Sequence, residues 1–194
     1  MNDRAAPSPT TQPGDGALAA AASRGDRAAA EQLVNRHLPA VRRFLLRLTD
    51  RHADADDLTQ ETMLRMLRHA HHYDPARPMT TWLFAIAYRL WLNHAAKAAR
   101  RKAAPLISEP GTRDVDASAA RDQQTHARRL IEDALQQLTP AQRDAVVLFH
   151  QQQLPLDDAA AVMGVPVNTL KSHLHRARAR LRELLEPHRE ALTP

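Results

Sequence analysis

The sequence predicts an all-α protein in which two small helical domains are joined by a flexible linker, the second domain carrying a helix-turn-helix. Apolar residues recur at steps of three and four in several long segments, which is the period of an α-helix. No segment alternates apolar and polar residues between turn signals, as a strand would. Pro, Gly, Ser, Thr and Asp gather between residues 103 and 122 without a sustained period, and this composition indicates the linker.

The composition divides the chain into five segments. Residues 1–16 are rich in Pro, Thr, Asp and Gly and are predicted to form a disordered tail. Residues 17–102 and 123–187 are predicted to be the two helical domains, on either side of a linker at 103–122. A short tail at 188–194 completes the chain.

The first long helix of the N-terminal domain is predicted to begin near Asp26. Pro39 lies inside its pattern and predicts a kink or a break, because proline removes a main-chain donor and its ring crowds the preceding turn. Steps of four, three, four and three predict one buried stripe along this helix, made of Val34, Leu38, Val41, Leu45 and Leu48.

Two further helices are predicted in the same domain. Asp54 is expected to cap the second one, which reaches about His69. Thr80 or Thr81 is expected to cap the third, which runs from Trp82 to about Ala99.

The C-terminal domain ends in a strongly basic helix. Thr139-Pro140 is expected to open a fresh helix, and the turn Gly164-Val165-Pro166 separates the last two helices. Residues 168–182 contain four arginines, one lysine and two histidines but no acid. A basic helix after a three-residue turn is typical of a helix-turn-helix that reads the DNA major groove. The alternative is a solvated cationic helix end that complements its own dipole.

The position along this helix suggests which side chains meet which part of DNA. The first turns of a recognition helix enter the groove, so five residues there are expected to reach base edges: Asn168, Thr169, Lys171, Ser172 and His175. Arg176 and Arg178 lie further along and suit phosphates better.

A second cationic segment lies in the N-terminal domain. No acid occurs from Pro75 through Ser108, whereas Arg77, Arg89, Lys97, Arg100 and Arg101 all do. Aromatic residues are interleaved with them, namely Tyr73, Trp82, Phe84, Tyr88 and Trp91. Cations for phosphates and rings for unstacked bases are the ingredients of single-strand binding. The alternative for each ring taken alone is a place in the core.

Acidic residues have the opposite distribution. Asp54, Asp56, Asp57 and Glu61 gather at the start of the predicted second helix. They either complement the helix dipole or form a polar docking face for a protein partner, and the pattern alone leaves both open.

Composition excludes several classes of function. The 194 residues carry a formal net charge of +5 and no cysteine, which excludes disulfides, thiol catalysis and Cys-ligated zinc. No apolar run is long enough to span a bilayer, and the first residues lack the pattern of a signal peptide, so a cytoplasmic protein is expected. His69, His71 and His72 are close in sequence, but adjacent loop histidines indicate surface composition more often than a metal site. No cofactor, metal or catalytic residue is expected.

Taken together, these segments resemble a bacterial RNA polymerase sigma factor of the extracytoplasmic-function class. Three stretches carry the resemblance in the right order. Residues 54–62 (DADDLTQET) look like the family's polymerase-docking helix, and residues 81–87 (TWLFAIA) look like its promoter-melting segment. Residues 138–143 (LTPAQR), with 164–178, look like its C-terminal domain.

The resemblance implies a role for each segment. Core RNA polymerase would be bound through Asp57, Leu58, Gln60 and Glu61. The melted promoter element would be held by Tyr73, Arg77, Trp82, Arg89, Asn93, Lys97, Arg100 and Arg101, and the C-terminal helix would bind the more distant duplex element. The family implies that such a chain initiates transcription of a dedicated regulon, makes or breaks no bond, and is controlled by an anti-sigma partner.

One alternative remains at this stage. A stand-alone helix-turn-helix regulator would explain residues 164–182 but would leave the segment from Trp82 to Lys102 without a role. Arg89, Asn168 and His175 also differ from residues usual in the family, and this leaves the preferred promoter sequence open.

Overall fold

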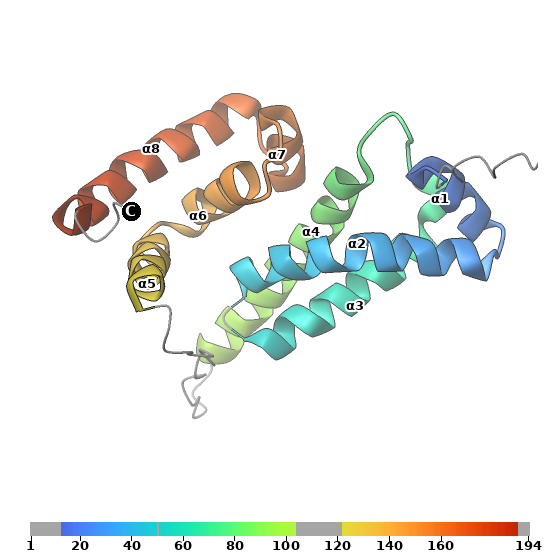
Figure 1. Cartoon of the computed structure of the whole chain (residues 1–194), viewed down its shortest axis with the longest axis horizontal. Coiled ribbons are helices and arrows are strands. Elements are labelled where there is room, and N and C mark those ends of the chain that lie inside the picture. Colours follow the sequence, from blue (N-terminus) through green and yellow to red (C-terminus); the bar gives the residue numbers. More distant parts are fainter. Residues whose placement is uncertain (1–12, 50, 104–121, 190–194) are drawn as a thin grey trace, which may run out of the picture.

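The computed structural model describes residues 13–49, 51–103 and 122–189, and every regular element within these ranges is helical. Figure 1 shows two groups of helices, α1–α4 in the first half of the chain and α5–α8 in the second. The predicted all-α class and the two helical groups are therefore confirmed. Residues 104–121, where most of the linker is predicted, lie outside the described residues, and the domain boundaries stay a prediction.

The first helix is one that the sequence pattern did not predict. α1 (Asp15–Ser23) begins within the last two residues of the predicted tail. It is held because Leu18 and Ala19 are buried and because Asp15 lies 2.6 Å from Nη1 of Arg36 on the next helix. A short, alanine-rich helix has little amphipathic pattern of its own, so its position depends on these contacts.

α2 (Arg27–Leu48) runs without interruption through Pro39, so the expected break is absent. Its start is as predicted, because the Asp26 carboxylate accepts a hydrogen bond from the Ala29 main-chain N–H at 3.0 Å. The exposed Pro39 ring sits on the side away from the core. Buried residues both before and after it hold the helix together, namely Leu33, His37, Val41, Phe44, Leu45 and Leu48.

The next two long helices begin earlier than expected. α3 (His52–Arg68) places Asp54 in its first turn rather than at the cap. α4 (Met79–Ala103) begins before both threonines that were expected to cap it. Thr81 is buried, and its hydroxyl has no hydrogen-bond partner in the described part of the chain. A short 3-10 turn, η1 (Ala70–His72), follows α3.

The second group contains the predicted helix-turn-helix. Pro140 stands at the start of α6, as expected, and the Gln142 side chain accepts a hydrogen bond from the Thr139 N–H at 3.2 Å. Gly164 has φ 68°, the left-handed conformation that lets the chain turn between the last two long helices. The elements are α5 (Asp122–Gln136), α6 (Pro140–Val146), η3 (Val147–Gln151), α7 (Leu156–Met163), α8 (Val167–Leu185) and η4 (Glu186–His188).

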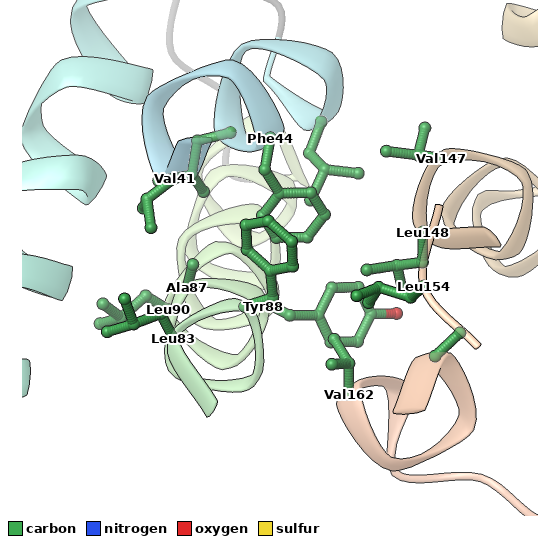
Figure 2. Packing of buried hydrophobic residues seen from close by; sticks show 14 of the residues in the cluster. Val41, Phe44, Leu83, Ala87, Tyr88, Leu90, Val147, Leu148, Leu154 and Val162 are labelled. Carbon is green, nitrogen blue, oxygen red and sulfur yellow. The ribbon is translucent and has the colours of Figure 1, made fainter. Parts of the chain in front are cut away.

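The two groups share one continuous hydrophobic core instead of standing apart. α4 packs on α2 and α3 with one face and on α7 with another. Figure 2 shows the Tyr88 ring projecting from α4 toward Leu148, Leu154 and Val162 of the second group. At the end of that ring, the Tyr88 hydroxyl donates a hydrogen bond to Oδ2 of Asp144 at 2.9 Å.

Candidate nucleic-acid interface

α4 has three distinct faces, and one of them carries the predicted DNA-binding residues. At 100° per residue, Trp82, Arg89, Asn93 and Arg100 fall within about 40° of one another, with Lys97 at the edge. Arg89, Asn93, Lys97, Arg100 and Arg101 are all exposed. None of them is ion-paired with a described residue, so the positive charge of this face is open to a polyanion.

An aromatic pair lies at the N-terminal end of the same face. The rings of Tyr73 and Trp82 are both partly exposed, with centroids 5.5 Å apart. The Tyr73 hydroxyl donates to the main-chain carbonyl of Arg77 at 2.7 Å, which closes the loop before α4 and fixes the ring. Burial raises the pKa of Tyr73, with smaller contributions from Asp15 and Asp74, so it stays a neutral donor. Tyr73 and Trp82 therefore form a fixed aromatic surface, partly exposed to solvent, next to the cations of α4.

Two of the other three aromatic residues of this segment are buried in the core, as the alternative for each ring proposed. Phe84 is 3% exposed and packs on Phe44 at a centroid distance of 4.8 Å. Tyr88 is 5% exposed and faces the second group. These two rings offer no stacking surface to a base. Trp91 is partly exposed and packs against the core, and its indole N–H donates to the Leu48 carbonyl at 3.0 Å.

α8 presents the second cationic face. Leu170, Leu174 and Ala177 are buried against the rest of the group, as the three- and four-residue steps predicted. The residues predicted to meet DNA all project away from that core and are exposed: Asn168, Thr169, Lys171, Ser172, His175, Arg176 and Arg178. The Ser172 hydroxyl donates a hydrogen bond at 3.0 Å to the main-chain carbonyl of Asn168, one turn earlier on the same helix.

Arg178 differs from Lys171 and Arg176 because its side chain contacts another part of the protein. Its Nη2 lies 3.3 Å from Nε2 of His150, and its guanidinium carbon lies 6.0 Å from the Phe149 ring centroid. Burial, and then the charge of Arg178, lower the pKa of His150, so the ring is a neutral acceptor at pH 7. Arg178 is thus held at the side of the helix, where its position suits a phosphate better than a base.

The predicted polymerase-docking residues share one face of α3, with one exception. Asp57 and Gln60 are exposed, and Glu61 is partly exposed with a 2.7 Å ion pair to Arg65. Leu58 is turned about 100° from Asp57 around the helix and is 8% exposed, so its side chain packs into the core.

Leu64 is the residue of this face that the sequence reasoning missed. It is 48% exposed, and it falls in helical register with Asp57 and Glu61. It follows Met63 directly and precedes Leu67 by three residues, so apolar spacing alone does not say whether Leu64 is buried. One sequence feature does indicate that Leu64 is exposed. It shares a helix face with the acids Asp57 and Glu61, whereas the buried residues of α3 lie on other faces.

The three histidines after α3 lie near one another. The ring centroids of His71 and His72 are 3.9 Å apart, and that of His69 lies 6.4 Å from His71 and 6.1 Å from His72. In the described ranges, no group of three or more His, Cys, Asp or Glu side chains is arranged to hold a metal ion. A search of the same residues finds no helix that is long and apolar enough to cross a membrane.

Two family models match the chain, one on each helical group. Sigma-70 region 2 matches residues 33–101, which include α3, most of α2 and nearly all of α4. Sigma-70, region 4, matches residues 128–181, which include α6, α7 and most of α8. Together they cover more than half of the chain. The chain is a sigma factor.

Relatives place this sigma factor in the extracytoplasmic-function (ECF) class. The ECF RNA polymerase sigma factor SigM of Mycobacterium tuberculosis is 37% identical over 172 residues, covering 88% of this chain and 84% of SigM. The RNA polymerase sigma factor CarQ of Myxococcus xanthus is 35% identical, covering 83% of this chain and 91% of CarQ. The ECF sigma factor SigE of Mycolicibacterium smegmatis is 34% identical over 84% of this chain, which spans 65% of that longer protein.

Solved structures of sigma factors have the same fold. The sigma factor RpoE of Bartonella quintana, solved with the anti-sigma factor NepR, has a TM-score of 0.65 at 28% identity and covers 80% of this chain and 96% of its own. CnrH, solved with the cytosolic domain of CnrY, has a TM-score of 0.64 at 28% identity and covers 89% and 97%. The stand-alone regulator is not favoured, because region 2 accounts for the segment that it left without a role.

Proposed function

We propose that this sigma factor engages core polymerase through α3, a melted promoter strand through α4 and duplex DNA through α8. The observation that carries the proposal is the presence of two exposed cationic faces, one on each helical group, with no acid between residues 75 and 108 or between 168 and 182. A regulator that reads a single duplex site needs only one such face.

On α4, the cations and the aromatic pair act together. Lys97, Arg100 and Arg101 hold the phosphates of a separated strand, and Arg89 and Asn93 lie between them and the aromatic edge. A base rotated out of the stack meets the partly exposed rings of Tyr73 and Trp82. Stacking is worth about 1–3 kcal/mol per base, enough to favour the separated strand once polymerase has bent and unwound the duplex.

On α8, the first two turns enter the major groove. Asn168, Lys171 and His175 present one amide, one ammonium and one imidazole along the same exposed face. Arg176 and Arg178 then hold the phosphates at the edge of the groove. Because displaced counterions drive such contacts, binding to this element weakens steeply with salt.

The chain between the two groups is long enough for them to separate. Residues 104–121 number eighteen, and an extended chain spans about 3.3 Å per residue, so the groups can move as much as about 60 Å apart. Two promoter elements at different places on the polymerase are therefore within reach of one chain.

Three further assignments follow from this role. The sigma factor makes or breaks no bond itself, since polymerase carries the chemistry. It acts in the cytoplasm, where bacterial polymerase and promoters are found. An anti-sigma protein is proposed as its regulator, in line with the sigma factor RpoE of similar fold, which was solved with the anti-sigma factor NepR.

The test is transcription with core polymerase on a promoter library randomised at both elements. We expect selected start sites and two preferred sequence blocks, and weak binding of the free chain to duplex DNA. Tight sequence-specific binding by the chain alone, with no promoter selection in the presence of core polymerase, would contradict the proposal and support a stand-alone regulator.

A further inference from the structure

The contact between the two helical groups includes one buried carboxyl group. Asp144 of α6 is 2% exposed, and its Oδ1 has no hydrogen-bond partner among the described residues. Its Oδ2 accepts a single hydrogen bond, from the Tyr88 hydroxyl of α4. A buried carboxylate is stable only with several donors or a cation, and here it has one neutral donor.

The surroundings of Asp144 supply little compensation for its charge. Arg143 precedes it on α6, but its guanidinium donates to the carbonyls of Leu135 and Gln136 at 3.1 Å each. α7 and α8 turn apolar side chains inward, namely Ala159, Ala160, Val162, Leu170, Leu174 and Ala177. On α2, Arg43 and Arg47 line an open cleft of about 340 Å³ near Phe84 and Leu154 at the border of the two groups.

We infer that this sigma factor closes on itself through the Tyr88–Asp144 contact and that uptake of a proton by Asp144 favours the closed state. The inference rests on the proposed function in one respect, that the groups must separate to reach two promoter elements. The molecule then has two alternative states. In the closed state the two helical groups pack on each other as in Figure 1, and in the open state they are separated. Only the closed state buries Asp144 against α4.

The direction of the pH dependence follows from the burial. Burial raises the pKa of Asp144 to about 6 in the closed state, and the Tyr88 hydrogen bond and Arg143 only partly offset this. In the open state the carboxyl regains water and titrates near its ordinary 3.8. The closed state is thus favoured most below pH 3.8, and the advantage is lost as the pH rises through 6.

The size of the effect can be stated as a ratio. With these two pKa values, the ratio of closed to open molecules rises about tenfold between pH 8 and pH 5. A smaller open fraction lowers the apparent affinity for any ligand of the open state by the same factor. Acidification would therefore hold the sigma factor away from promoters without any second protein.

The experiment measures the distance between the two groups in the full chain, without polymerase or DNA. The chain has no cysteine, so Gln32→Cys on α2 and Ala179→Cys on α8, both exposed, give two unique sites for single-molecule energy transfer. We expect the closed population to grow about tenfold relative to the open one from pH 8 to pH 5. Asp144→Asn should remove that dependence and leave the closed state populated at both pH values.

Two further variants keep the test interpretable. Asp157→Asn makes the same change at an exposed position of α7 and should retain the wild-type response. Tyr88→Phe keeps the ring and removes the donor, so the open population should grow at pH 5. A wild-type ratio that does not change with pH, or a tenfold response that survives Asp144→Asn, would overturn the inference. Core-polymerase binding is measured separately, so failure of the proposed function would be seen there and not in this assay.

Discussion

The Trp91 indole N–H donates a hydrogen bond to the main-chain carbonyl of Leu48 across 3.0 Å. Leu48 is the last residue of α2, where a helix leaves its final carbonyls without partners inside the helix. The bond therefore satisfies an otherwise open acceptor and fastens the cationic half of α4 to α2. The indole N–H of Trp82, in contrast, donates no hydrogen bond to a described residue.

Replacing Trp91 with Phe should therefore cost stability more than Trp82→Phe does. The change leaves the Leu48 carbonyl unpaired and reduces buried ring area, and we expect a loss of about 2 kcal/mol in the free energy of unfolding. Trp82→Phe is the matched control and should cost less than about 1 kcal/mol, because the Trp82 indole N–H has no hydrogen-bond partner among the described residues to lose. Urea unfolding followed by far-UV circular dichroism gives both values, and equal losses would contradict the assignment.

Leu64 gives a sharper test of the docking face than the acids do. Leu64→Ala should weaken binding to core polymerase about tenfold, since an exposed leucine at the centre of a docking face is buried by the partner. The unfolding free energy should hardly change, because the side chain is 48% exposed in the free chain. Ile131→Ala on α5, at 42% exposure, is the matched control. A competition assay with labelled sigma factor measures the affinities, and similar losses for both variants would refute the docking role.

How far the sequence predicted the fold depended on whether the deciding contact was local. The helix-turn-helix was predicted well, because Pro140, Gly164 and the steps from Leu170 to Ala177 act within a few residues of one another. α1 was missed because its stability comes from Arg36 and His37, more than twenty residues away. Pro39 was expected to break α2, but buried side chains on both sides outweigh the one lost hydrogen bond.

The same distinction holds for the site. The cationic faces of α4 and α8 follow from helical spacing alone, so their exposure was predictable. The resemblance assigned Leu58 to polymerase docking, yet its side chain is buried, and the exposure of Leu64 was not predicted. Periodicity does not say which of two apolar stripes meets the rest of the protein. The packing of Tyr88 against Asp144 joins residues 56 positions apart, and no local pattern indicates it.

The carboxylate of Asp15 gives a prediction about pH. Burial acts to raise its pKa, but hydrogen bonds and charge from Arg36 and His37 outweigh burial and hold the pKa below the ordinary 3.8. The stabilisation is therefore present above pH 3.8 and is lost as the pH falls through the lowered value. Asp15→Asn should unfold at lower urea than wild type at pH 7, and the two should converge as the pH falls through the lowered pKa of Asp15. A gap that stays constant with pH would show that the ion pair is not its source.

The recognition helix can be tested by the salt dependence of promoter binding. Lys171 and Arg176 are exposed and form no ion pair with a described residue, and Arg176 is the one that we place on a phosphate. Changing both to Ala should lower the slope of log affinity against log salt by at least about 0.9, the value for one phosphate contact. Arg180→Ala is the control, because Arg180 is already paired with Glu183 at 3.1 Å and should change the slope by less. Binding of the polymerase–sigma complex to promoter duplex, measured from low to physiological salt, gives the slopes. An unchanged slope in the double variant would mean that α8 does not lie along the phosphate backbone. A reduced affinity of the double variant for core polymerase would mean that α8 has a structural role.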